Sequence, residues 1–221
     1  MLNILLNPVQ AIQQAKTEKS LVKSIIVALL AGIVSAIAGI VTTLPVLALA
    51  SKSVDPTNVI IGAVIGFAIG VLTVLILTIV SGFLTSKVMS VLGGTGGFFE
   101  GLTVSAYSGI ISAVGVLILT IFSSISTQIT KSGFISLQVS GLLGMLVLLI
   151  GLVIAIIILA ISIATAYKAM KELFSTDYIT VIVAMTVMFT AAIIVMYLLV
   201  ITSIMGMVGS IGSTMGAVGM L

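Results

Sequence analysis

GGTGGFFEGLTVSAYSG, the stretch from Gly93 to Gly109, breaks a chain that is otherwise almost wholly aliphatic. A run of glycines followed by two phenylalanines and one glutamate specifies something other than another apolar span. Three interpretations are open: a loop that cradles a phosphate, a catalytic turn, or a connector between two helices. The surrounding sequence has to decide among them.

The composition of the chain identifies its broad class. Hydrophobic residues make up 61% of the 221 positions and charged residues 6%, and the mean hydropathy is +1.50. Soluble domains carry far more charge, so this is a polytopic membrane protein. The absence of cysteine excludes disulfides and thiolate metal sites. The net charge of +3 is small and dispersed, which argues against a nucleic-acid partner.

Five segments are long and apolar enough to cross a bilayer as helices, which takes about 20 residues each. They are Leu21–Ala50, Val59–Ser86, Leu102–Ser126, Val139–Tyr167 and Tyr178–Met205. The alternation that marks the strands of a membrane barrel is absent from these segments. The sequence therefore predicts an all-α bundle of five transmembrane helices, and a regular first helix that kinks or ends near Pro45.

The lysines predict how the bundle is oriented in the membrane. One side of the predicted topology carries Lys16, Lys19, Lys23, Lys87, Lys168 and Lys171, and the other carries Lys52 and Lys131. Since lysine-rich flanks face the cytoplasm, the N-terminus is expected to be cytoplasmic and the C-terminus external. The 93–109 stretch then lies on the cytoplasmic side.

Three parts of the chain follow from this topology. Residues 1–20 form a cytoplasmic segment in which Asn7-Pro8 begins a short amphipathic helix, expected to lie on the inner leaflet. The alternative is a positively charged flank that only sets topology. Residues 21–205 form the five-helix domain. Residues 206–221 form a glycine-rich tail that extends the last span, folds back, makes an oligomer contact or is disordered.

Small residues predict where the helices approach one another, because close backbone packing drives helix association in lipid. Gly62, Gly66 and Gly70 recur at four-residue intervals in the second span, and Ser35 and Gly39 have the same spacing in the first. We expect these two faces to meet. A homodimer through Gly62 and Gly66 is the alternative.

The residues that most enzymes need are missing or badly placed. The chain has no histidine or cysteine, and its five acids all lie outside the predicted spans, with no two of them placed for acid–base work. No cofactor, metal, nucleotide or catalytic residue is predicted. In the 93–109 stretch the spacing is not that of a phosphate-binding loop, no lysine reaches a phosphate, and no strand precedes it.

The remaining interpretation of the 93–109 stretch is a connector that also serves as a docking loop. Its glycines allow a turn with positive φ, which we expect at Gly94. Phe98 and Phe99 should lie at the headgroup level, and Glu100 should begin the third helix, where its charge suits the helix dipole. Tyr107 should pack its ring between spans with its hydroxyl bonded to a neighbour.

The order of these features resembles the Yip-domain family, multi-pass membrane proteins named for interacting with Ypt/Rab GTPases. Asn7-Pro8 leads into the first span, and Tyr167–Glu172 ends the fourth. Between them lies the glycine-led signature, which is matched here by Leu92, Gly93, Gly94, Gly96, Phe99, Leu102, Val104, Tyr107 and Ser108.

The resemblance implies five spans, a cytoplasmic N-terminus and no catalysis, with roles in vesicle traffic and membrane shaping in eukaryotic relatives. We therefore expect a non-enzymatic multi-pass membrane protein, in the plasma membrane if the source is prokaryotic. Its expected partners are the lipid bilayer and a membrane or cytosolic protein or a second copy. The alternative is a small permease, channel or lipid-moving protein with a polar seam of Thr42, Thr43, Ser105, Ser108 and Ser112.

Overall fold

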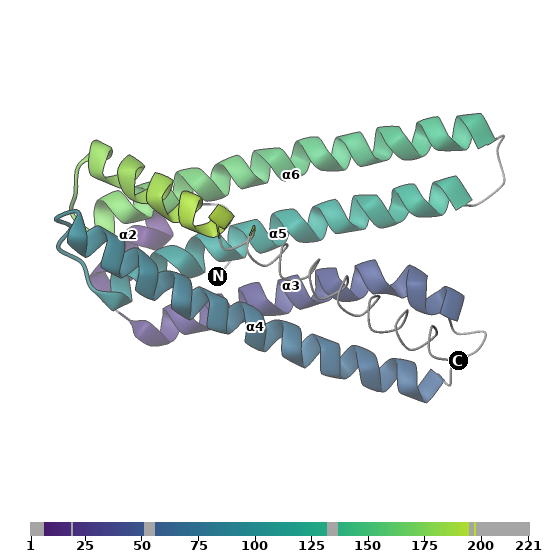
Figure 1. Ribbon diagram of the computed structural model, residues 1–221, viewed down its shortest axis with the longest axis horizontal. Coiled ribbons are helices and arrows are strands. Elements are labelled where there is room, and N and C mark those ends of the chain that lie inside the picture. The colour runs from purple at the N-terminus through teal and green to yellow at the C-terminus, as the bar shows by residue number, and fades with distance from the viewer. Residues whose placement is uncertain (1–6, 19, 51–55, 132–136, 195–196, 198–221) are drawn as a thin grey trace, which may run out of the picture.

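The computed structural model describes residues 7–18, 20–50, 56–131, 137–194 and 197 (Figure 1). These residues are helical apart from short turns. The helices are α2 (Pro8–Glu18), α3 (Leu21–Ala50), α4 (Pro56–Val91), α5 (Phe98–Lys131), α6 (Leu137–Leu173) and a shorter helix, Tyr178–Ile194. The part of the chain that the structure describes contains no strand.

The predicted helical membrane bundle is confirmed. Four of the helices, α3 to α6, are long and apolar enough to cross a membrane, and each contains one of the predicted spans. The helix Tyr178–Ile194 begins where the fifth span was predicted to begin, and residues 195–196 and 198–205 of that prediction lie outside the described residues. The predicted tail 206–221 lies outside them as well.

Proline has different effects at three positions. Pro8 and Pro56 are the first residues of α2 and α4, the position at which proline costs no helix hydrogen bond. Pro45 was expected to kink or end the regular helix, but α3 continues as a helix to Ala50. The side chain of Pro45 lies outside the described residues.

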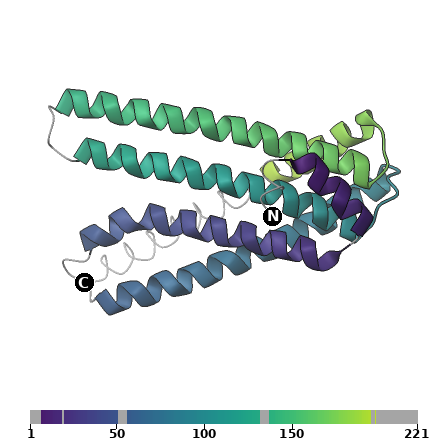
Figure 2. The ribbon, with the colours of Figure 1, turned by 180° about the vertical axis from the view of Figure 1, so that it is seen from behind.

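The α5 helix lies at the centre of the bundle and packs against α3, α4 and α6, while α2 packs across α5 and α6 (Figures 1 and 2). The pair α3–α4 and the pair α5–α6 come together at one end and diverge toward the other. We call these the capped end and the open end. The loop between α4 and α5, the α2 helix and the start of the Tyr178–Ile194 helix all lie at the capped end.

The tightly packed core of the protein lies at the capped end. Its fully buried side chains come from every helix that meets there and include Ile12, Ala28, Met89, Ala106, Phe174 and Ala184. Toward the open end, large apolar side chains such as Ile61, Leu142 and Leu146 are more than half exposed. Such a surface is suited to lipid, which replaces protein contacts around the diverging helices.

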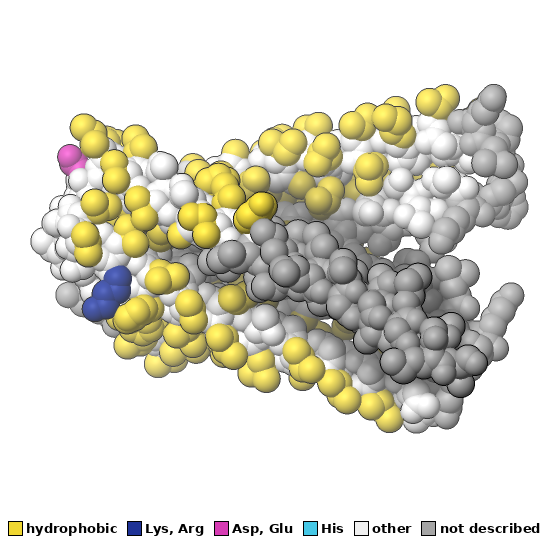
Figure 3. Space-filling view, viewed as in Figure 1, with side chains coloured by type: hydrophobic (Ala, Val, Ile, Leu, Met, Phe, Trp, Pro, Cys, Tyr) yellow, Lys and Arg dark blue, Asp and Glu magenta, His cyan; other side chains and the backbone are white. Residues whose placement is uncertain are grey.

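The long helices exceed the thickness of a bilayer. The 36 residues of α4 extend for about 54 Å, whereas a hydrocarbon core is about 30 Å thick. The charged side chains visible on the face shown in Figure 3 lie at the capped end. Five described lysines lie in α2 or near the helix ends that meet here, namely Lys16, Lys23, Lys87, Lys168 and Lys171. The capped end is therefore the part best suited to extend out of the membrane.

Candidate functional site

The 93–109 stretch connects α4 to α5 by a tight turn. Gly93 has a φ of 88°, and its N–H donates to the carbonyl of Ser90 at 3.3 Å. Gly94 donates to the carbonyl of Met89 at 2.8 Å. A positive φ was expected at Gly94, but among the described glycines only Gly93 has one. The left-handed residue stands directly after the last turn of α4, where it ends the helix.

The loop is held on the side chain and backbone of Phe174, which follows α6. Phe174 is fully buried. Its carbonyl accepts hydrogen bonds from the N–H of Thr95 at 3.0 Å and from the Thr95 hydroxyl at 3.2 Å. A Cβ on Gly96 would lie 2.5 Å from the Phe174 ring, and one on Gly94 3.3 Å from the Phe174 Cβ. These two glycines are therefore required for space.

Glu100 lies in the first turn of α5 and caps that helix. Its carboxylate accepts a hydrogen bond from the N–H of Gly97 at 2.7 Å, three residues back, which is the reciprocal half of a capping box. Phe98 is 39% exposed, whereas Phe99 is half-buried and its carbonyl accepts from the Thr103 hydroxyl at 2.9 Å. The two phenylalanines thus differ, because only Phe98 is free to reach headgroups or a partner.

A close helix crossing lies between Gly82 of α4 and Gly101 of α5. A Cβ on Gly82 would lie 2.6 Å from the Cα of Leu102, and one on Gly101 would collide with the carbonyl oxygen of Gly82. This pair was not predicted as a packing site. Small residues do recur at four-residue intervals on both helix faces, as Thr78, Gly82 and Ser86 on α4 and as Gly101, Ser105 and Gly109 on α5, so the spacing could have marked it.

Tyr107 and Ser108 lie in the first turns of α5. The Tyr107 ring is 5% exposed and belongs to the core at the capped end, as expected. The hydrogen bond expected from its hydroxyl is not among those that the described residues form. Ser108 donates to the carbonyl of Val104 at 2.8 Å and accepts on its own carbonyl from the Ser162 hydroxyl at 2.9 Å. Both residues thus join α5 to the rest of the bundle.

Serine and threonine hydroxyls link neighbouring helices. Ser24 pairs with Thr103 at 2.9 Å, Ser81 with Ser105 at 3.1 Å, and Ser112 with Ser162 at 2.7 Å. Thr42 bonds within its own helix, to the carbonyl of Gly39 at 2.6 Å, and the side chain of Thr43 lies outside the described residues. The described members of the proposed polar seam therefore face other helices or their own backbone.

The α2 helix is docked onto protein. Its apolar face, formed by Ala11, Ile12 and Ala15, is buried against α5 and α6. Lys16 donates to the carbonyl of Glu172 at 2.8 Å, at the end of α6 where unpaired carbonyls attract a cation. The sequence predicted a helix on the inner leaflet with Val9 and Ile12 on its apolar face. Ile12 packs on the bundle instead, together with Ala11 and Ala15, because these small or medium side chains fit between two helices.

The carboxylates near the capped end are held by local partners. Hydrogen bonds from Lys23 and then from Gln14 keep the pKa of Glu18 below its ordinary value. Asp177 caps the last helix by accepting from the N–H of Thr180 at 2.9 Å, and its bonds with Thr180 lower its pKa. Both acids are therefore ionised capping or pairing groups at neutral pH.

Aromatic contacts fix the turn between α6 and the last helix. The rings of Tyr167 and Tyr178 stack with their centroids 6.1 Å apart. The Lys171 ammonium lies 3.4 Å from the centre of the Tyr178 ring, a cation–π contact. Ser175 takes up a φ of 50° in the turn. These contacts therefore hold the end of α6 in place beneath the loop that packs on it.

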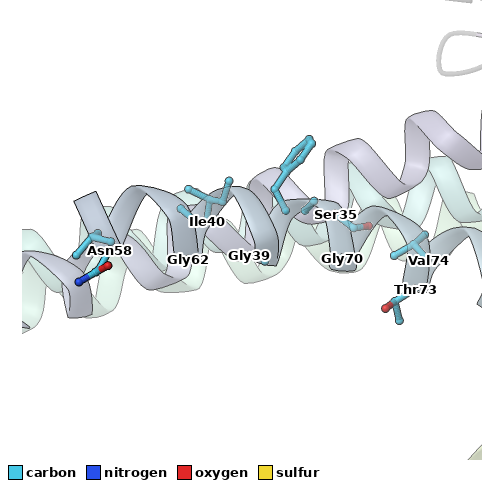
Figure 4. A pocket seen from close by; sticks show the side chains of 13 residues that line it. Ser35, Gly39, Ile40, Asn58, Gly62, Gly70, Thr73 and Val74 are labelled. Carbon is cyan, nitrogen blue, oxygen red and sulfur yellow. The ribbon is translucent and has the colours of Figure 1, made fainter. Parts of the chain in front are cut away.

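A groove of about 670 Å³ separates α3 from α4 at the open end (Figure 4). Gly39, Gly62 and Gly66 line it, and a Cβ on any of the three would meet no atom within 4 Å. Close contact between the helices occurs nearer the capped end, where Gly32 faces Val71 and Gly70 faces Ala36. The tight packing predicted at Gly62 and Gly66 is thus absent among the described residues, because α3 and α4 diverge there.

The described residues contain no group of three or more His, Cys, Asp or Glu side chains that could hold a metal ion. The arrangement at the capped end is instead a packed shell of turns, caps and small-residue contacts around Phe174.

Comparison with known proteins identifies one relationship. The family model of the Yip1 domain matches residues 2–200. No curated protein and no solved structure matches the chain.

Proposed function

The chain belongs to the Yip1-domain family, and from that premise we propose that it is a non-enzymatic membrane protein that holds a cytosolic protein at its capped end. The family places it in a membrane. We assign the contact with the partner to the loop of residues 92–97 between α4 and α5.

One observation carries the proposal: Val91 is 85% exposed directly beside a loop that is fixed in place. Phe98, on the other side of the same loop, is 39% exposed. Exposed apolar side chains at the two ends of a rigid loop outside the membrane core are suited to a protein partner. The lysines of the capped end favour a partner whose apolar pocket has an acidic rim.

The shell under the loop supports this role. Gly94 and Gly96 bring the loop onto Phe174, and Thr95 bonds to the Phe174 carbonyl. A loop held from beneath loses little conformational entropy when a partner binds. The glycines and Thr95, which are unusual for a membrane span, thus all help to fix the surface of this loop.

The test uses a photo-crosslinking amino acid at Thr95, which is exposed, in membranes of the source cell or a close host. We expect one discrete adduct with a cytosolic protein, lost with Val91→Asp and kept with Val91→Leu. The same probe at Val139, near the open end, is the matched control. An adduct that Val91→Asp leaves unchanged, or lipid adducts at both probe positions, would contradict the proposal.

The alternative of a permease or channel has less support. Its proposed seam residues Ser105 and Ser112 are each bonded to a serine of a neighbouring helix, an arrangement that favours packing. Reconstitution into vesicles with a solute-flux assay separates the two functions. We expect no flux above that of protein-free vesicles.

A further inference from the structure

We propose that the groove between α3 and α4 holds one acyl chain of a membrane lipid, with the polar part of that lipid beside Asn58. This site is separate from the loop of residues 92–97 and does not depend on the function proposed for that loop.

The shape of the groove is set by small residues. Gly39 of α3 and Gly62 and Gly66 of α4 face it without a Cβ, while Ile40, Phe67 and Val74 supply apolar wall (Figure 4). The contacts of Gly32 with Val71 and of Gly70 with Ala36 close the end toward the core. The groove therefore has a volume of about 670 Å³ and is closed at the end toward the core.

The groove is continuous with the surface that faces the bilayer. Ile61, Ile65 and Ile69 alternate along α4 with the groove glycines and are 51%, 53% and 58% exposed. Ser35, Asn58 and Thr73 are the polar residues of the lining and the other residues are apolar or glycine, so water would find few polar partners in the groove. If the groove were empty, the side chains that line it would lack dispersion contacts on that side. The surrounding bilayer supplies hydrocarbon chains that can fill the groove.

The length and polarity of the groove fit one lipid rather than a free hydrocarbon. From Asn58 to Gly70, where the contact with Ala36 closes the groove, α4 rises by about 18 Å, more than the roughly 15 Å that half of a hydrocarbon core requires. Asn58 lies near the start of α4 and is exposed. Its amide can donate to an ester or phosphate oxygen, which sets the headgroup at the open end and the chain toward the core.

The experiment uses purified full-length protein in vesicles of phosphatidylcholine that carries a photoactivatable diazirine in one acyl chain. After irradiation, peptides are analysed for lipid adducts. We expect adducts concentrated on the groove residues between Ser35 and Ile40 and between Val59 and Val74. Gly66→Leu, which fills the slot, should remove most of this labelling.

Ile65→Leu, on the lipid-facing side of the same helix, is the matched control and should leave the labelling unchanged. A thermal unfolding midpoint of Gly66→Leu close to that of the parent chain shows that the variant folds. Labelling spread evenly over groove and lipid-facing residues such as Leu149 would mean surface lipid only and would overturn the proposal. A Gly66→Cys disulfide between two copies, or with a cysteine in the predicted glycine-rich tail of residues 206–221, would also overturn it.

Discussion

Gly101 of α5 lies against Gly82 of α4 so closely that a Cβ on Gly101 would collide with the Gly82 carbonyl oxygen. This contact joins α5, which begins after the loop of residues 92–97, to α4, which precedes that loop. It fixes the angle at which the two leave the turn. The position of the loop therefore depends on two residues that lack side chains.

Gly101→Ala should lower the stability of the bundle by about 1–3 kcal/mol, because the added methyl group overpacks a backbone contact. Thermal unfolding in detergent measures the effect. Gly109→Ala in the same helix is the control, since a Cβ there meets no atom within 4 Å. That change should be neutral or stabilising. Equal loss at both positions would contradict the contact.

Phe174→Ala should destabilise the capped end by about 3–5 kcal/mol, the usual cost of removing a buried phenylalanine. The ring is fully buried under Gly94 and Gly96. Phe189→Ala removes the same group from a side chain that is 70% exposed and should have little effect. Hydrogen exchange of the amides of residues 92–97 should rise in the first variant and not in the second.

Gly93→Val should cost about 1–3 kcal/mol, since a β-branched residue is strained at the positive φ of Gly93. Gly93→Asn should cost much less, because asparagine tolerates this conformation. Chemical unfolding of the three proteins in one detergent gives the comparison. A valine variant as stable as the asparagine variant would show that the turn does not need this φ. Added nucleotide should stabilise none of the three.

The orientation of the bundle can be tested with single cysteines at positions that the structure describes. A cysteine at Thr130, near the open end of α5, should react with a membrane-impermeant maleimide on intact cells. A cysteine at Lys168, near the capped end of α6, should react only after the cells are opened. The opposite labelling pattern would place the capped end outside the cell and remove the basis for a cytosolic partner.

Several features of the protein could be predicted from the sequence because they depend on local chemistry. Apolar runs longer than about 20 residues have few alternatives to a membrane helix, so α3 to α6 were predicted in their correct places. Pro8 and Pro56 begin helices because proline there has no hydrogen bond to lose. Glu100 caps α5 for a similarly local reason.

The position of the positive φ was predicted within one residue. Gly93 and Gly94 are adjacent glycines, so composition does not distinguish which of them turns the chain. The choice depends on where α4 ends, and that end is fixed by the bond from Gly94 to Met89 and by the contact with Phe174.

The sequence by itself determined that this chain is a helical membrane protein with a glycine-rich connector, because hydropathy, helix length and capping act over a few residues. Only the tertiary structure decided which small residues touch. Gly62 and Gly66 fit a packing motif yet line an open groove, whereas Gly101, which has the same spacing with Ser105 and Gly109, makes a close crossing with Gly82. Helix contact depends on where the axes cross and diverge, and those angles are set by Phe174, α2 and the turns at the capped end, which are brought together from distant parts of the chain.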